Sequence, residues 1–241
     1  MIYCIIVSVI STTKGNYMKI IAKIYTPFRE KFGIPRQSGL ADSLVSRIIF
    51  EPEYRVKEAL RGIEGFSHLW LIWEFSKAKS DKWSPTVRPP RLGGNKRMGV
   101  FATRSPYRPN PIGLSSVRLI GIEETKEWGA VLLVSGADLL DGTPIYDIKP
   151  YLSFADSHPD SKDGFAEYVR EDRLTVEIGE DLLDKVIKEK REGLIAVLKG
   201  DPRPSYQDDP ERIYGMKFSD YEIFFKVSEC KLKVTDIKEL K

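Results

Sequence analysis

Cysteine is scarce in this chain, and the scarcity excludes several classes of small protein. Only Cys4 and Cys230 occur among 241 residues, and they form no C-x-x-C pair. A zinc site or a disulfide framework requires more thiols at closer spacing. We therefore expect no bound metal, and we take the reducing cytoplasm as the default location.

Two further absences narrow the choice of fold. Met1–Ile10 is apolar but too short to span a membrane, and it lacks the basic start and cleavage site of a signal peptide. No G-x-G-x-x-G follows a strand-like segment, which disfavours a doubly wound nucleotide-binding domain. Met18 opens a stretch typical of a domain start. We interpret residues 1–17 as an extension, and an added N-terminal strand is the alternative.

The net charge is only +3, with 41% hydrophobic and 30% charged residues. This composition is that of a globular protein rather than a polycation, so any nucleic-acid site must be a local patch. One stretch meets that requirement. Residues 88–118 contain seven basic residues and no acid, together with five prolines and four glycines. Proline and glycine exclude one long helix there and predict stiff loops around short strands.

The pattern of short apolar segments predicts a mainly β protein. We expect a two-sided buried strand at Phe66–Phe75, a strand at Met98–Thr103, and a hairpin formed by Leu114–Glu124 and Gly129–Ser135. Such a series is typical of a barrel or a sandwich.

The character of the sequence changes after residue 156. We interpret residues 18–156 as the first domain and residues 157–172 as a linker. Residues 173–241 predict a small α+β C-terminal domain, with a helix at Asp181–Lys199 followed by strands.

Several motifs together carry a resemblance to a known family. They are Lys31–Gln37 (KFGIPRQ), Gly65–Trp70 (GFSHLW), Thr86–Leu119, Asp141–Tyr151 (DGTPIYDIKPY) and Asp201–Tyr206 (DPRPSY). With these motifs the chain resembles the TsaA-like or TrmO family of S-adenosylmethionine-dependent tRNA (adenine-N6)-methyltransferases. The resemblance covers roughly residues 18–227.

The resemblance implies a fold, a reaction and an assembly. The fold is a β-barrel catalytic domain, and the assembly is a homodimer with cofactor sites near the subunit interface. The reaction is methylation of N6 of threonylcarbamoyladenosine at position 37, in the anticodon loop of tRNA. The implied S-adenosylmethionine site maps onto Pro35, Arg36, Gln37, Ser76, Lys77, Arg104, Leu114, Asp141, Gly142, Thr143 and Pro144.

Methyl transfer from a sulfonium is an in-line displacement, so the protein mainly aligns donor and acceptor. Arg36 or Arg104 is suited to the cofactor carboxylate. Asp141 suits the ammonium or the ribose hydroxyls, and the turn carbonyls around Gly142 suit the adenine amine. Leu114 and Pro144 suit apolar walls for the adenine.

The acceptor nitrogen loses a proton, which calls for a general base. Asp138, Asp147, Tyr146 and His68 are the candidates, and the sequence does not choose among them. Asn110 precedes a proline, as do the polar residues with which other N6-adenine methyltransferases hold the target amine. Binding of tRNA requires cations for its phosphates, and an aromatic ring on which a loop base can stack. We assign this role to Arg88, Arg91, Lys96, Arg97, Tyr107 and Arg108.

Two other functions fit parts of this pattern. One is a methyltransferase that acts on another RNA or on a small molecule. The other is a non-catalytic RNA-binding module, although RNA binding alone does not require the Pro35–Gln37 and Asp141–Pro144 motifs.

Overall fold

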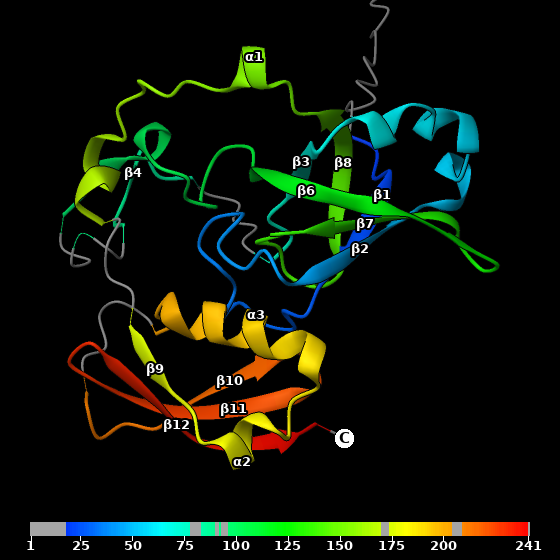
Figure 1. Ribbon diagram of the computed structural model, residues 1–241. Coiled ribbons are helices and arrows are strands. Elements are labelled where there is room, and N and C mark those ends of the chain that lie inside the picture. The colour runs from blue at the N-terminus through cyan, green and yellow to red at the C-terminus, as the bar shows by residue number, and fades with distance from the viewer. Residues whose placement is uncertain are drawn as a thin grey trace, which may run out of the picture.

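The structure is a computed structural model that describes residues 18–77, 83–89, 92, 96–169, 174–203 and 209–240. Six strands close into one barrel in the order β1-β2-β7-β6-β3-β8, in which β1 pairs with both β2 and β8 (Figure 1). These strands are β1 (Ala22–Tyr25), β2 (Val45–Phe50), β3 (His68–Glu74), β6 (Ile112–Thr125), β7 (Gly129–Ser135) and β8 (Thr143–Pro150). The predicted mainly β character is confirmed, and so is the predicted hairpin, formed by β6 and β7.

The aromatic strand β3 is less buried than its sequence suggested. Leu69, Leu71 and Trp73 are buried, whereas the residues between them are only half-buried. The prediction of a strand buried on both faces is therefore wrong. Along β3, one face packs into the barrel core and the other carries Trp70, whose ring lies 5.5 Å from that of Tyr151. Three short 3-10 helices, Pro52–Tyr54, Lys57–Leu60 and Ile63–Gly65, connect β2 to β3.

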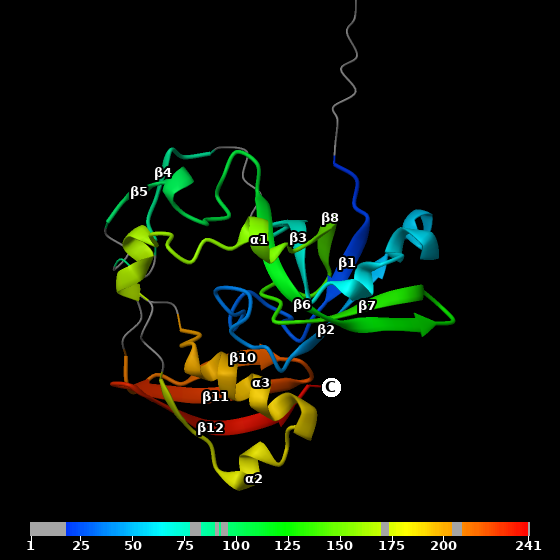
Figure 2. The ribbon, with the colours of Figure 1, turned by 45° about the horizontal axis from the view of Figure 1, so that its top comes forward.

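Between β3 and β6 the chain leaves the barrel and forms a separate lobe (Figure 2). We call its described residues 83–89, 92 and 96–111 the basic lobe. It contains β4 (Thr86–Val87), β5 (Met98–Gly99) and a 3-10 turn at Val100–Ala102. The predicted strand Met98–Thr103 is thus only two residues long. Its ladder ends where Val100 N donates to Pro85 O, because proline has no N–H to return.

The C-terminal domain is a four-stranded sheet with helices beside it. The strand order is β10-β11-β12-β9, and only β9 runs parallel to its neighbour. The elements are β9 (Thr175–Glu177), α2 (Glu180–Leu183), α3 (Lys188–Lys199), β10 (Tyr214–Phe218), β11 (Tyr221–Ser228) and β12 (Lys231–Glu239). The predicted linker also contains a 3-10 helix, Gly164–Val169, which follows the short α1 (Ser153–Asp156).

The single helix expected at Asp181–Lys199 is two helices. Ile187 is extended (φ −57°, ψ 141°) and begins α3 anew. Arg191 holds the break, because its Nε donates to Val186 O at 2.7 Å and its Nη1 lies 2.9 Å from Asp184 Oδ1.

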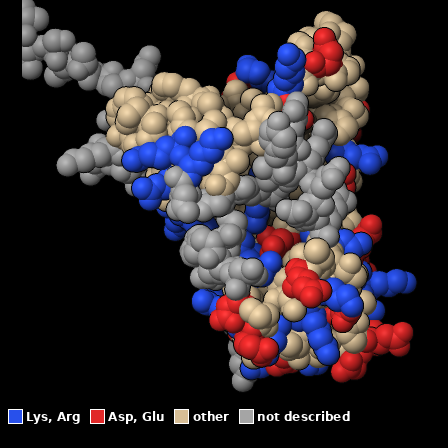
Figure 3. Space-filling view, turned by 90° about the vertical axis from the view of Figure 1, so that its left-hand side faces the viewer, with Lys and Arg blue, Asp and Glu red and all other residues tan. Residues whose placement is uncertain are grey.

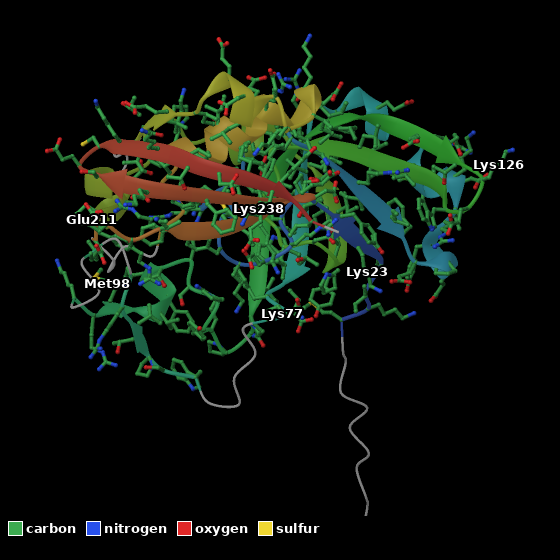
Figure 4. All side chains as sticks on the ribbon, turned by 90° about the horizontal axis from the view of Figure 1, so that it is seen from below. Lys23, Lys77, Met98, Lys126, Glu211 and Lys238 are labelled. Atoms are coloured by element: carbon green, nitrogen blue, oxygen red, sulfur yellow. The ribbon has the colours of Figure 1, made fainter. Side chains whose placement is uncertain are left out.

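The loop between β1 and β2 joins the two domains. Phe28, Ala41 and Leu44 of this loop belong to the hydrophobic core of the C-terminal domain, and Phe32 and Ile34 pack against that core. Figures 1 and 2 show the loop between the barrel and α3. Seen from below, Met98 of the basic lobe and Glu211 lie toward one end of the molecule, and Lys126 lies at the other (Figure 4). Among the described residues, no helix is long and apolar enough to cross a membrane.

Candidate functional site

A cavity of about 630 Å³ opens where four segments of the first domain meet. These segments are the β1–β2 loop, the end of β3 with the residues after it, residues 103–116, and the β7–β8 loop. Eight residues predicted to bind the cofactor line this cavity: Pro35, Arg36, Gln37, Ser76, Lys77, Arg104, Leu114 and Thr143. Its volume lies within the range of roughly 300–1,000 Å³ that is usual for small-molecule sites.

Three predicted cofactor residues do not line the cavity and instead shape the turn before β8. Asp141 Oδ1 accepts a hydrogen bond from Thr26 N at 2.9 Å. Gly142 has a φ of 72°, which favours glycine, and its N–H bonds to Ile24 O. Pro144 is buried opposite Lys23 in the barrel ladder. Together they fix the course of the chain into Thr143, which is part of the cavity wall.

A chain of hydrogen bonds ends on Asp138 inside the cavity. Trp73 Nε1 donates to Ser115 Oγ at 3.0 Å, and Ser115 Oγ donates to Asp138 Oδ1 at 2.6 Å. Burial raises the pKa of Asp138 above its usual value, although the hydrogen bond from Ser115 and the charge of Arg104 oppose the shift. A carboxyl group with a raised pKa in a cavity is a typical proton acceptor.

The strand pairing explains why this indole reaches Ser115. Trp73 lies opposite Gly113 in the β3–β6 ladder. A Cβ at Gly113 would lie only 2.3 Å from the indole atom Cε2. Glycine therefore leaves room for the ring to lie across β6, and the neighbouring ring of Phe75 is 4.3 Å away, centroid to centroid.

The two arginines proposed for the cofactor carboxylate have different surroundings. Arg104 is exposed at the cavity, and its Nη1 donates to Gln37 Oε1. Arg36 Nη2 instead donates to the carbonyl oxygens of Asp201 at 3.0 Å and Arg203 at 3.3 Å. These carbonyls belong to the C-terminal domain. The Arg36 side chain thus joins two of the sequence motifs, one from each domain.

Four candidate catalytic residues lie outside the cavity lining: Asp147, Tyr146, His68 and Asn110. Burial and the neighbouring Glu74 raise the pKa of Tyr146 to about 12, so its phenol stays protonated at neutral pH. Asp147 pairs with Lys149 at 2.9 Å on the same strand. His68 lies beside the ring of Tyr151, 6.2 Å between centroids. Of the five candidates, Asp138 alone lines the cavity.

The residues predicted to contact tRNA gather on the basic lobe, with one exception that lies outside the described residues, Arg91. Arg88, Lys96 and Arg97 are exposed, and Tyr107 is 56% exposed. Arg108 is half-buried and donates to Thr103 O at 2.7 Å, so it also holds the lobe together. In Figure 3, Lys and Arg side chains spread over the upper left part of this face with few acids among them.

Sequence reasoning missed the supporting residues of the site. Ser115 and the role of Trp73 as a donor depend on contacts between residues 23 and 42 positions apart. It also missed two exposed rings of the basic lobe: Trp83, which precedes the motif Thr86–Leu119, and Phe101, which lies within that motif but was given no role. Among the described residues, no group of three or more His, Cys, Asp or Glu is placed to hold a metal ion.

Fold and site together define a class of protein: a small barrel with a cofactor-sized cavity beside a cationic surface. Two family profiles match the chain. The tRNA-methyltransferase O N-terminal domain matches residues 23–157, and the TrmO C-terminal domain matches residues 171–240. The chain therefore belongs to the TrmO family.

Individual relatives agree with the family. The tRNA (adenine(37)-N6)-methyltransferase of Escherichia coli K12 is 40% identical over 222 residues, which cover 89% of this chain and 94% of that protein. A Pseudomonas aeruginosa relative, whose name describes an S-adenosylmethionine-dependent methyltransferase, is 42% identical over 213 residues, covering 84% and 89%. A crystal structure of TrmO from Pseudomonas aeruginosa matches with a TM-score of 0.73 at 33% identity, covering 92% and 98%.

Proposed function

We propose that the protein is a tRNA methyltransferase that uses S-adenosylmethionine to methylate N6 of threonylcarbamoyladenosine at position 37. The observation that carries this proposal is the cavity. It brings Asp138, a carboxyl group with a raised pKa, together with Arg104 and most of the residues that the family resemblance assigns to the cofactor. The family membership and the name of the Escherichia coli relative support the reaction.

Residues of the cavity suit three groups of the cofactor: its carboxylate, its adenine and its positively charged sulfur. Arg104 is the cation for its carboxylate, because the guanidinium of Arg36 is held by carbonyls of the C-terminal domain. Leu114, 57% exposed at the cavity, offers an apolar wall for the adenine. The rings of Trp73 and Phe75 offer π-faces to a cation. When bound, the cofactor supplies a methyl group on a positively charged sulfur, already activated for displacement.

We assign the general base to Asp138. As the N6 nitrogen takes the methyl group, its proton passes to the Asp138 carboxylate. The hydrogen bond from Ser115 orients that carboxylate, and burial raises its pKa above the ordinary value of an aspartate, which makes it a stronger base. The residue sits beside Arg104, so the acceptor nitrogen and the cofactor meet within one cavity.

The partner in this proposal is the anticodon loop of tRNA, bound by Arg88, Lys96, Arg97 and Tyr107 of the basic lobe. The family resemblance further supports a homodimer with cofactor sites near the subunit interface, and a cytoplasmic location. Light scattering tests the assembly: a mass of one chain at micromolar concentration would contradict the dimer.

Methyl transfer from labelled S-adenosylmethionine tests the reaction. We expect label in tRNA that carries the threonylcarbamoyl group and none in tRNA with unmodified adenosine 37. Equal labelling of both would move the substrate to another site or RNA. Calorimetry with S-adenosylmethionine alone tests the non-catalytic alternative, since a simple RNA-binding module would show no binding.

Asp138→Asn tests the base. Loss of general base catalysis lowers kcat by about 10²- to 10⁴-fold, and we expect the affinity for S-adenosylmethionine to change little. Asp147→Asn is the matched control, because Asp147 lies outside the cavity lining. A kcat unchanged in Asp138→Asn would remove this residue from the reaction.

A further inference from the structure

Two large aromatic rings lie open on the basic lobe. Trp83 is 53% exposed and Phe101 is 73% exposed. Their ring centroids are 6.3 Å apart and their planes differ by 29°, so the two rings form one stacked pair. The guanidinium of Arg108 lies 5.9 Å from the centre of the Phe101 ring. Two adjacent exposed rings form a contiguous apolar patch, and such patches are often functional, whereas single exposed apolar side chains are common.

Contacts within the lobe hold Phe101, one ring of this aromatic pair, in place. Arg108 Nη1 donates to Thr103 O at 2.7 Å and lies 3.4 Å from Val100 O. Phe101 is the central residue of the 3-10 turn Val100–Ala102, which Val100 N anchors to Pro85 O at 2.9 Å. Phe101 is therefore presented on a short, braced turn that has little order left to gain on binding, and the ring of Trp83 stacks against it.

The charge around the rings identifies the kind of partner. Arg88, Lys96 and Arg97 of the same lobe are exposed, and the sequence from residue 88 to 118 contains no acid. The core of a protein–protein interface is usually depleted of charge, whereas single-stranded nucleic acid is bound by cations that follow its backbone and rings that stack on its bases. The surface therefore fits an unpaired RNA segment.

We propose that Trp83 and Phe101 form a stacking surface for an unpaired base of the tRNA loop, next to the adenosine that enters the cavity. This inference rests on the proposed function. Its link to the cavity is short: Thr103, Tyr107 and Arg108 line the cavity wall and belong to the same lobe as Phe101. Phosphates meet the arginines and lysine, and a neighbouring base covers the exposed rings.

Phe101→Ala and Trp83→Ala test the stacking surface. Loss of one base–aromatic stack weakens single-strand binding by roughly 5- to 100-fold, so we expect the Kd and KM for tRNA to rise by this factor in each variant. The Kd for S-adenosylmethionine should not change, and neither should the dependence of log Kd on log salt. Phe101→Trp should retain binding, and Phe101→Leu, apolar but without a π-face, should not.

Phe154→Ala is the matched control, because Phe154 is 88% exposed on α1, outside the basic lobe. An unchanged tRNA Kd in Phe101→Ala would overturn the inference. So would full binding by Phe101→Leu, or conversion of a dimer to a monomer by Phe101→Ala, which would assign the rings to a subunit contact. If the wild-type protein binds tRNA through these rings yet methylates none, the proposed reaction fails and the stacking surface stands.

Discussion

A single methyl group at Gly33 tests whether the C-terminal domain supports the loop between β1 and β2, which carries Pro35 and Arg36 of the proposed cofactor site. Gly33 has a φ of +90°, and an added Cβ would lie 2.3 Å from Met216 Sδ and 2.7 Å from its Cγ. Met216 is 1% exposed in the core of the C-terminal domain, so it has little room to withdraw. Gly62 has a φ of +87° and nothing within 4 Å of an added Cβ. It is the matched control, because it shares the backbone conformation without the contact.

The two alanine variants separate backbone strain from packing. Gly62→Ala should lower the free energy of unfolding only through the strain of the left-handed conformation, about 1–2 kcal/mol. Gly33→Ala adds overpacking of about 1–3 kcal/mol to the same strain, which gives a loss of roughly 2–5 kcal/mol in total. Urea unfolding of both variants measures the difference. We also expect Gly33→Ala to weaken S-adenosylmethionine binding in calorimetry, since the cavity residues Ile34, Pro35 and Arg36 follow it in the chain, whereas Gly62→Ala should not. Equal losses of stability, or unchanged cofactor affinity in Gly33→Ala, would refute the reasoning.

Four further predictions concern the cavity and its support. Because burial raises the pKa of Asp138, kcat/KM should rise with pH through a value above that of ordinary aspartate, and Asp138→Asn should remove this dependence. Because the pKa of Asp138 is higher in the folded than in the unfolded state, its contribution to folding stability is present below the unfolded-state pKa and is lost as pH rises through the folded-state pKa. Urea unfolding at several pH values across that range measures this loss. Arg104→Ala removes a charge-assisted contact and should lower S-adenosylmethionine affinity by about 10- to 100-fold in calorimetry; unchanged affinity would exclude Arg104 from the site. Arg203→Ala breaks the ion pair with Asp201, beside the carbonyls that hold Arg36. It should raise the KM for S-adenosylmethionine with little change in kcat. A lower kcat at constant KM would contradict this supporting role.

The sequence predicted the elements that depend on neighbouring residues. The hairpin of β6 and β7 and the strands β10, β11 and β12 follow from local alternation and turn residues, and the structure contains them, whereas β9 was not predicted. The prediction of a single helix at Asp181–Lys199 was wrong, because the break between α2 and α3 depends on Arg191. Its side chain contacts Val186 O and Asp184. Apolar spacing alone does not register such a side-chain contact. The prediction that β3 is buried on both faces was also wrong, since large aromatic rings can remain half-buried where the barrel meets solvent.

The candidate site likewise contains residues that the sequence predicted and residues that it did not. Residues that line the cavity and were anticipated, such as Gln37 and Thr143, lie in motifs that the family resemblance carried. Ser115 was not anticipated, because a serine in a strand gives no signal until Trp73 and Asp138 are placed on either side of it. The choice of Asp138 among the candidate bases likewise required burial and position, which residue type does not supply.

The two arginines show how far the site extends beyond the barrel. Their chemistry is identical, so the sequence offered both Arg36 and Arg104 for the cofactor carboxylate. The structure distinguishes them by their acceptors: Arg36 reaches Asp201 O, 165 residues away, while its neighbour Gln37 accepts from Arg104. The C-terminal domain thus fixes the loop that in turn orients the cation at the cavity. Because Phe28 and Leu44 are also buried in that domain's core, the loop depends on the second domain for its position. The proposed cofactor site is therefore a property of both domains, although the described residues that line the cavity all belong to the first.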